Sequence, residues 1–127
     1  YSMKKLLLSL LFVFTSLHAE VEWFEYEKAL ESAKDTNKII MVMLGRGSCS
    51  VCRYMKTVVF HDKNVIKKLQ PKFISVYLEL DFDDVPEEFT YVGTPTFYFV
   101  DKNEKILYHF NGGKTVPSFL QALDEVN

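Results

Sequence analysis

The stretch IIMVML at residues 39–44, followed by GSCSVCR at 47–53, decides the fold of this chain. The first part is an apolar run without a polar face, which is typical of a central strand buried on both sides of a sheet. The second part opens a predicted helix over 49–60, with Cys49 and Cys52 on its first turn. Two thiols spaced this way can close and reopen a small-ring disulfide. Because the chain contains only 2 cysteines, all of its thiol chemistry is concentrated here.

Cys49 is the predicted nucleophile of this pair. At a helix N-terminus, the helix dipole and the free N–H groups stabilise a thiolate. Ser48, Arg46 and Arg53 surround Cys49 in the sequence, and both arginines could add to that stabilisation. Cys52 is predicted to lie deeper and to resolve a mixed disulfide formed by Cys49. Taken alone, a CxxC pair also fits a zinc site or a haem attachment site.

Apolar periodicity and turn residues place the other elements around this unit. The order of strands and helices predicts an α/β fold with a mixed sheet covered on both faces. Asp62 is the predicted N-cap of the second part of the long helix. The predicted helices cover 23–35, 49–60, 63–69, 86–91 and 116–126, and the predicted strands cover 39–44, 73–80, 97–100 and 106–110.

Residues 3–19 have the composition of a secretory signal peptide. Lysines follow Met3, an apolar run covers 6–14, and Ala19 stands before the acidic Glu20. Residues 1–2 precede the apparent initiator methionine and are interpreted as a cloning remnant. Cleavage after Ala19 leaves one domain over 20–127, and an uncleaved membrane anchor is the alternative. Export predicts a periplasmic or otherwise extracytoplasmic protein, where a CxxC pair meets an oxidising environment.

The composition is that of an ordinary globular domain. The chain has 127 residues, of which 48% are hydrophobic and 25% are charged, and its formal net charge is -2. A nucleic-acid partner is not expected, because the basic surface that such a partner requires is missing. The composition does not determine an oligomeric state.

With these features the chain resembles thioredoxin-fold proteins over residues 20–127. The resemblance rests on CSVC at 49–52 after a buried strand and on GTPT at 93–96 before a predicted hairpin. Residues 26–39 resemble the lead-in of exported proteins of the thioredoxin-7 type, and residues 59–65 also resemble the C-terminal domain of DsbD. The resemblance implies a thioredoxin fold: a central mixed four-stranded sheet with helices on both faces and an extra N-terminal helix.

The resemblance also implies the parts of a site. Cys49 and Cys52 would be the catalytic residues, without a cofactor or a metal ion. The Thr94–Pro95 peptide bond would be cis, and Thr94 would offer its backbone to an extended client segment. Two features depart from thioredoxins, in which Trp precedes the first cysteine and a buried Asp lies beneath the pair. Ser48 and Met43 take those places, so deprotonation of the resolving thiol must rely on water or another group.

These features favour an exported thiol–disulfide oxidoreductase that acts on client proteins. A membrane or periplasmic redox partner would recycle it. The DsbD-like stretch favours a reductase, and an oxidase or isomerase of the same fold is the alternative. From a different class, capture and delivery of a soft metal ion such as Cu(I) would use the same two thiols.

Overall fold

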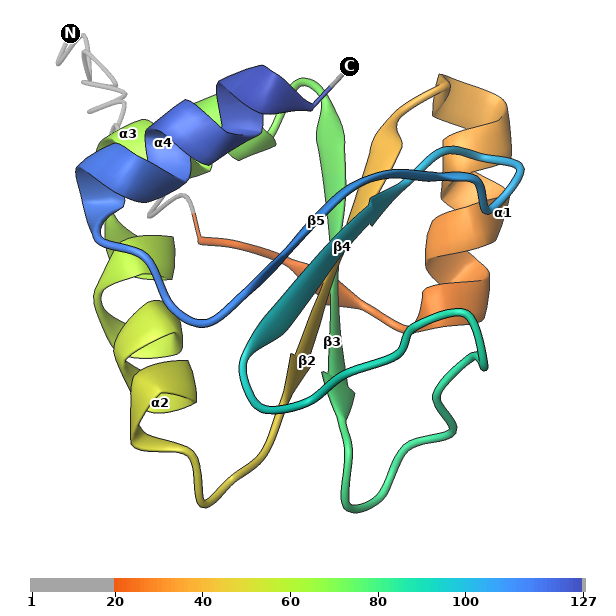
Figure 1. Ribbon diagram of the computed structural model, residues 1–127. Coiled ribbons are helices and arrows are strands. Elements are labelled where there is room, and N and C mark those ends of the chain that lie inside the picture. The colour runs from red at the N-terminus through yellow and green to blue at the C-terminus, as the bar shows by residue number, and fades with distance from the viewer. Residues whose placement is uncertain (1–19, 127) are drawn as a thin grey trace, which may run out of the picture.

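A mixed five-stranded sheet forms the centre of the molecule (Figure 1). The computed structural model describes residues 20–126, so the predicted signal peptide lies outside the described residues. The strand order is β1-β3-β2-β4-β5, with β1, β3 and β2 parallel and with β4 and β5 each antiparallel to its preceding neighbour. The strands are β1 (Trp23–Phe24), β2 (Ile39–Gly45), β3 (Phe73–Glu79), β4 (Thr96–Val100) and β5 (Ile106–Asn111).

Helices cover both faces of the sheet, as the sequence predicts. One face packs against α1, and the other packs against α2, α3 and α4 (Figure 1). Strand β2 is buried along Ile40–Gly45 because it lies between these two cores. The helical segments are α1 (Tyr26–Thr36), α2 (Ser50–Thr57), the 3₁₀ turn η1 (Val59–His61), α3 (Lys63–Leu69) and α4 (Val116–Glu125). None of the helices within residues 20–126 is long and apolar enough to span a membrane.

The predicted count of four strands is wrong, because β1 adds a fifth. Trp23 and Phe24 pair with Ser75 and Val76 along the open edge of β3. The Trp23 ring also makes an edge-to-face contact with Phe60, with the centroids 5.2 Å apart. A strand of two residues shows no alternation, so the sequence gives no sign of it. The predicted N-terminal helix is present but begins at Tyr26 rather than at residue 23.

The predicted short helix over 86–91 is also wrong. This segment forms a single turn in which the Phe89 N–H donates to the Pro86 carbonyl. Phe89 is buried against Tyr98, with the ring centroids 4.9 Å apart, and the Tyr98 hydroxyl donates to the Thr90 carbonyl. The segment is therefore held by contacts with Tyr98 and not by a repeated series of helical backbone bonds.

The helical stretch after the cysteines divides into three pieces. Helix α2 ends at Thr57, η1 follows, and α3 then starts in a new direction. The Asp62 carboxylate accepts bonds from the backbone N–H groups of Asn64 and Val65, which makes it the predicted N-cap. The bend brings Phe60 into the core against Phe97 and Phe119.

Candidate functional site

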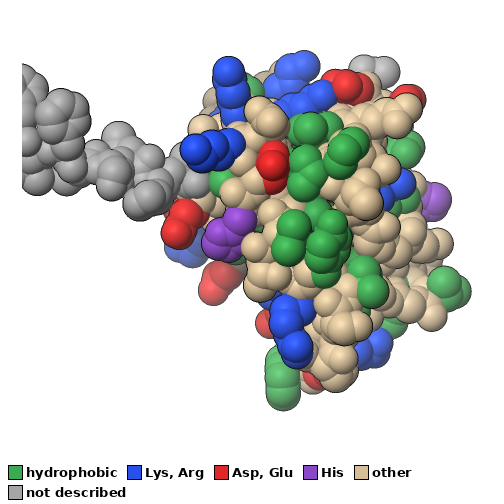
Figure 2. Space-filling view, turned by 90° about the vertical axis from the view of Figure 1, so that its left-hand side faces the viewer, with side chains coloured by type: hydrophobic (Ala, Val, Ile, Leu, Met, Phe, Trp, Pro, Cys, Tyr) green, Lys and Arg blue, Asp and Glu red, His purple; other side chains and the backbone are tan. Residues whose placement is uncertain are grey.

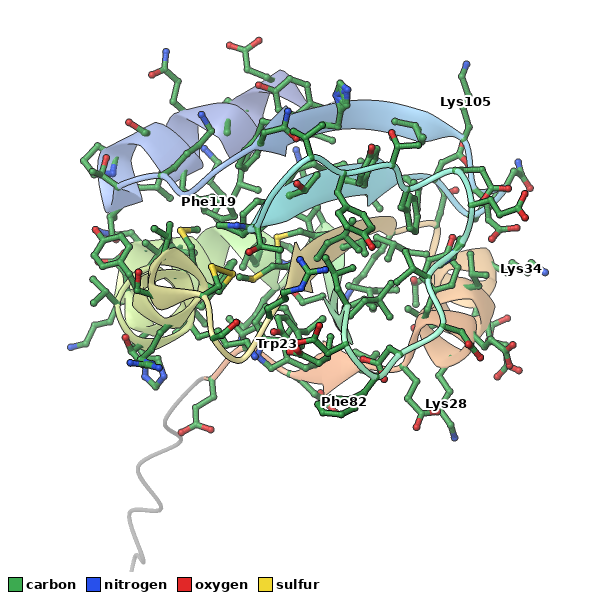
Figure 3. The ribbon with its side chains drawn as sticks, turned by 60° about the horizontal axis from the view of Figure 1, so that its bottom comes forward. Trp23, Lys28, Lys34, Phe82, Lys105 and Phe119 are labelled. Atoms are coloured by element: carbon green, nitrogen blue, oxygen red, sulfur yellow. A yellow bond between two sulfur atoms is a disulfide. The ribbon has the colours of Figure 1, made fainter. Side chains whose placement is uncertain are left out.

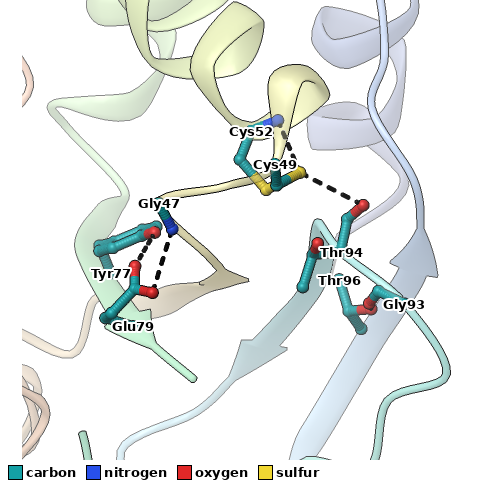
Figure 4. Close-up of a disulfide and its surroundings, with 8 residues drawn as sticks. All are labelled: Gly47, Cys49, Cys52, Tyr77, Glu79, Gly93, Thr94 and Thr96. Atoms are coloured by element: carbon teal, nitrogen blue, oxygen red, sulfur yellow. Dashed lines mark hydrogen bonds between the residues drawn. A yellow bond between two sulfur atoms is a disulfide. The ribbon is translucent and has the colours of Figure 1, made fainter. Parts of the chain in front are cut away.

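Cys49 and Cys52 form a disulfide at the start of α2, next to the end of β2 (Figure 4). Cys49 is the N-cap residue, and its Sγ accepts a hydrogen bond from the Cys52 backbone N–H at 3.1 Å. The same bond would stabilise a Cys49 thiolate after reduction, in addition to the helix dipole. Cys49 is partly exposed, whereas Cys52 is 2% exposed. This difference suits an attacking thiol at the surface and a resolving thiol beneath it.

The loop before β4 lies beside the cysteine pair. Its Thr94–Pro95 peptide bond is cis. The Thr94 carbonyl oxygen lies 3.6 Å from the Cys49 Sγ (Figure 4). Two hydrogen bonds hold the loop: the Thr96 hydroxyl donates to the Gly93 carbonyl at 2.8 Å, and the Gly112 N–H donates to the Pro95 carbonyl at 2.7 Å. The structure thus brings residues 45 positions apart in the sequence to one surface.

The residues predicted to tune the thiolate have different surroundings. The Arg46 Nε donates to the Asp81 carboxylate at 3.1 Å, and the guanidinium lies 5.8 Å from the centroid of the Tyr91 ring. Asp81 therefore neutralises part of the positive charge that Arg46 would otherwise present to Cys49. Arg53 lines a pocket beside the pair, and Ser48 is exposed next to Cys49.

Beneath the pair, the core is apolar on strand β2. Met43 is fully buried in the same cluster as Cys52 and Met55. Met43 also pairs with Tyr77 on β3. The side chain of Met43 cannot accept the proton of the resolving thiol, so any such acceptor must come from another element.

Sequence reasoning missed a polar cluster on the neighbouring strand. Tyr77, Glu79 and Lys56 line a pocket of about 200 Å³ that also contains Cys49 and Cys52. The Tyr77 hydroxyl donates to the Glu79 carboxylate at 2.7 Å, and the Gly47 N–H donates to its other oxygen at 3.1 Å (Figure 4). The signal for this cluster was present in strand alternation, which places residues 77 and 79 on one face of the sheet.

The environment of the cluster shifts two pKa values. Burial raises the pKa of the Tyr77 phenol well above its usual value, and the hydrogen bond to Glu79 adds to the rise. Burial lowers the pKa of Lys56, and the charge of Glu79 opposes that change. The Lys56 Nζ lies 3.2 Å from the centroid of the Tyr77 ring. Gly45 leaves room for this ring, since a Cβ at that position would lie 2.8 Å from the Tyr77 Cε2.

Exposed apolar side chains lie on the two elements that form the site. On the α2 side, Val51, Tyr54 and Val58 are 44%, 40% and 46% exposed. In the loop before the cis-proline, Tyr91 and Val92 are 41% and 94% exposed. Figure 2 shows the side of the molecule that carries α2, α3 and α4, where hydrophobic side chains gather between lysine and arginine side chains. Apolar side chains gathered in this way are typical of a surface that meets other proteins.

Residues 20–126 contain no group of three or more His, Cys, Asp or Glu side chains placed to hold a metal ion. A metal ion captured at the pair would therefore depend on the two thiolates and on ligands from elsewhere. The chemistry that the described residues support directly is the opening and closing of the Cys49–Cys52 bond.

A redox-active pair on the first turn of a helix, facing a cis-proline loop, defines the thiol–disulfide oxidoreductases of thioredoxin fold. A family model described as thioredoxin-like domain matches residues 26–127, and the chain belongs to that family. Both the predicted fold and the resemblance are thereby confirmed. Members of this class act on thiol or disulfide clients.

Solved structures agree with this assignment. A thioredoxin from Thermus thermophilus shares 26% identity, with a TM-score of 0.70 over 84% of this chain and 86% of that one. A DsbH oxidoreductase shares 19% identity, with a TM-score of 0.68 over 89% and 90% of the two chains. The C-terminal domain of Neisseria meningitidis DsbD shares 17% identity, with a TM-score of 0.60 over 84% and 100%. No curated protein sequence gives a significant match.

Proposed function

We propose that this protein reduces disulfide bonds in exported client proteins, through Cys49 as nucleophile and Cys52 as resolving thiol. The observation that carries the proposal is the position of the Cys49 Sγ. It caps α2, accepts the Cys52 N–H and lies 3.6 Å from the Thr94 carbonyl. A client disulfide that approaches along the Thr94 loop would meet the sulfur of Cys49 before that of Cys52, which is buried.

The surroundings of the pair suit a protein client. Val51 and Val92 expose apolar side chains near the two sides of the site, and Thr94 lies on a loop that an extended segment could follow. The signal-like sequence at 3–19 supports an exported location, such as a periplasm. A membrane or periplasmic thiol partner would return electrons to the pair after each turnover.

The charge distribution supports the reducing direction. A disulfide becomes a stronger oxidant when its thiolate form is strongly stabilised. Here Arg46 is paired with Asp81, which withdraws part of its charge from the Cys49 sulfur and leaves the helix N-terminus, with Arg53 and Lys56 in the adjoining pocket, to stabilise a thiolate. We therefore expect the reduction potential of the Cys49–Cys52 pair to be more negative than that of a strong oxidase.

The direction can be tested by equilibrating the protein with glutathione redox buffers. We expect a potential more negative than about −150 mV, the region occupied by thioredoxins, glutaredoxins and isomerases rather than by strong oxidases. The reduced fraction would be counted by alkylation and mass spectrometry. A value at or above that limit would contradict the reductase proposal and favour the oxidase alternative.

Removal of the resolving thiol should trap clients. In Cys52→Ala, Cys49 can still attack a client disulfide, but no second thiol can release the mixed disulfide. We expect covalent adducts in extracts of the exported compartment, visible on non-reducing gels and released by dithiothreitol. The double variant lacking both thiols is the matched control. Absence of adducts, together with tight Cu(I) binding by the reduced wild type, would instead favour soft-metal capture.

A further inference from the structure

Glu79 lines the same pocket as Cys52 and stands on β3, next to the strand that carries Met43. We propose that Glu79 accepts the proton of the Cys52 thiol, through water in the adjoining pocket, when Cys52 resolves the mixed disulfide. This assignment rests on the proposed function, because a resolving step exists only in a protein that exchanges disulfides. It makes Glu79 a positioning and proton-transfer residue of the same site.

The pocket connects the carboxylate with the pair. Cys49, Cys52 and Glu79 all line the space of about 200 Å³ next to α2. Since one water molecule occupies about 30 Å³ in the liquid, this space can hold a short chain of waters. Among the lining side chains, Lys56, Tyr77 and Glu79 give those waters hydrogen-bond partners, so a proton can move between groups that do not touch.

The carboxylate is held in a fixed orientation by two donors. Gly47 donates from the loop that leads into Cys49, and Tyr77 donates from β3. Each carboxylate oxygen has a second lone pair, which remains available to a water molecule. Because Gly47 is only two residues before Cys49, the same bond ties the carboxylate to the loop that carries the nucleophile (Figure 4).

The charges around Glu79 come from three parts of the fold. The Glu79 backbone N–H donates to the Asp83 carboxylate at 2.7 Å, and Lys56 supplies a positive charge over the face of the Tyr77 ring. A cation in the pocket would favour the negative charge that develops on the Cys52 sulfur during deprotonation. The titratable and charged groups that face this site are Tyr77 from β3, Lys56 and Arg53 from α2, and Arg46, Asp81 and Asp83 from the loops.

The reaction balances in the reducing direction. The Cys49 thiolate attacks a client disulfide, the Cys49–client bond forms, and the second client sulfur leaves as a thiolate. The Cys52 thiol then passes its proton through water to Glu79, and its sulfur attacks the Cys49 Sγ. The Cys49–Cys52 bond forms, the Cys49–client bond breaks, and the client sulfur leaves with the electron pair and takes up a proton. The client disulfide gains two electrons, and the cysteine pair loses them.

Glu79→Gln tests this role, because it keeps an oxygen acceptor of similar shape and removes the base. Reduced protein is mixed rapidly with oxidised glutathione, quenched with acid and analysed by mass spectrometry for the Cys49–glutathione adduct. We expect the adduct to form at the wild-type rate and to decay roughly 10²-fold more slowly at neutral pH, as for loss of a general base. The difference should shrink at alkaline pH, where hydroxide removes the Cys52 proton directly.

The controls separate this role from a structural one. Glu87→Gln removes an exposed acid of the neighbouring loop and should leave both rates unchanged. Thermal unfolding of Glu79→Gln checks that the fold is retained. If the adduct decayed equally fast in Glu79→Gln and in wild type, Glu79 would not be the proton acceptor. The same would follow if the variant slowed adduct formation and adduct decay equally at every pH. Either result would contradict the role of Glu79 and leave the proposed function standing. A wild type whose cysteine pair is not oxidised to the Cys49–Cys52 disulfide by oxidised glutathione would overturn the proposed function instead.

Discussion

Cys49→Ala should abolish disulfide exchange by this protein. The variant retains Cys52, but that residue is 2% exposed and lies inside the α2 face of the core. A buried thiol cannot align with a client disulfide, and burial in apolar surroundings also disfavours its thiolate. The chain has only these 2 cysteines, so no other thiol can take over. Reduction of insulin disulfides by dithiothreitol, followed by turbidity, should proceed at the rate seen without protein.

The comparison must separate lost chemistry from lost folding. Reduced wild type is the reference for stability, because Cys49→Ala also lacks the disulfide. The variant in which both cysteines are replaced should be as inactive as Cys49→Ala, since Cys52 by itself contributes nothing to turnover. If Cys49→Ala kept measurable activity that the double replacement lost, Cys52 would have to be the nucleophile.

Phe119→Ala should destabilise the fold more than any surface change. Phe119 belongs to α4, is fully buried, and lies on the side of that helix that faces the sheet (Figure 3). Its ring lies 5.3 Å from that of Phe60, 5.8 Å from that of Phe97 and 6.3 Å from that of Phe110, measured between centroids. Truncation of such a residue removes buried apolar surface and leaves a cavity, at a cost of about 3–5 kcal/mol. Since domains of this size are stable by only about 5–15 kcal/mol, a large share of the stability would be lost.

Urea unfolding of the reduced proteins measures this loss without the contribution of the disulfide. Gln121→Ala, two positions along the same helix and exposed, is the matched control and should change stability by less than about 0.5 kcal/mol. If Phe119→Ala lowered the free energy of unfolding by less than about 1 kcal/mol, the packing of α4 against the sheet would contribute little to stability. Because the cavity would lie near Cys52 and Met55, the variant also shows whether core packing influences the redox pair.

Much of the fold could be predicted from the sequence, because it depends on residues that are close together along the chain. The apolar run of β2, the cap at Asp62 and the spacing of Cys49 and Cys52 each act within one element or one turn. Their geometry depends on local periodicity and backbone capping, which a sequence displays directly. The resemblance predicts the Thr94–Pro95 loop as part of the site, and the Thr94 carbonyl lies beside the Cys49 sulfur.

The failures involve contacts between distant residues. Strand β1 exists because the edge of β3 is available to residues 23–24, and the segment at 86–91 is held by contacts with Tyr98. The influence of Arg46 on Cys49 stays a prediction, but its pairing with Asp81, 35 positions away, is another contact that the sequence does not show. Contacts between residues far apart in the sequence depend on how strands and loops pack in three dimensions. A local sequence pattern carries no information about that packing.

The sequence by itself determined the reactive pair, the helix that carries it and the α/β order around it. Only the tertiary structure decided what surrounds the pair. Parallel pairing of β2 with β3 sets Met43 beside Tyr77 and Gly45 beside Glu79, which brings a carboxylate to the cysteine pocket from another strand. The physical reason is that spacing along one helix fixes the distance between two thiols, whereas their electrostatic environment comes from strand register and side-chain packing across the whole domain.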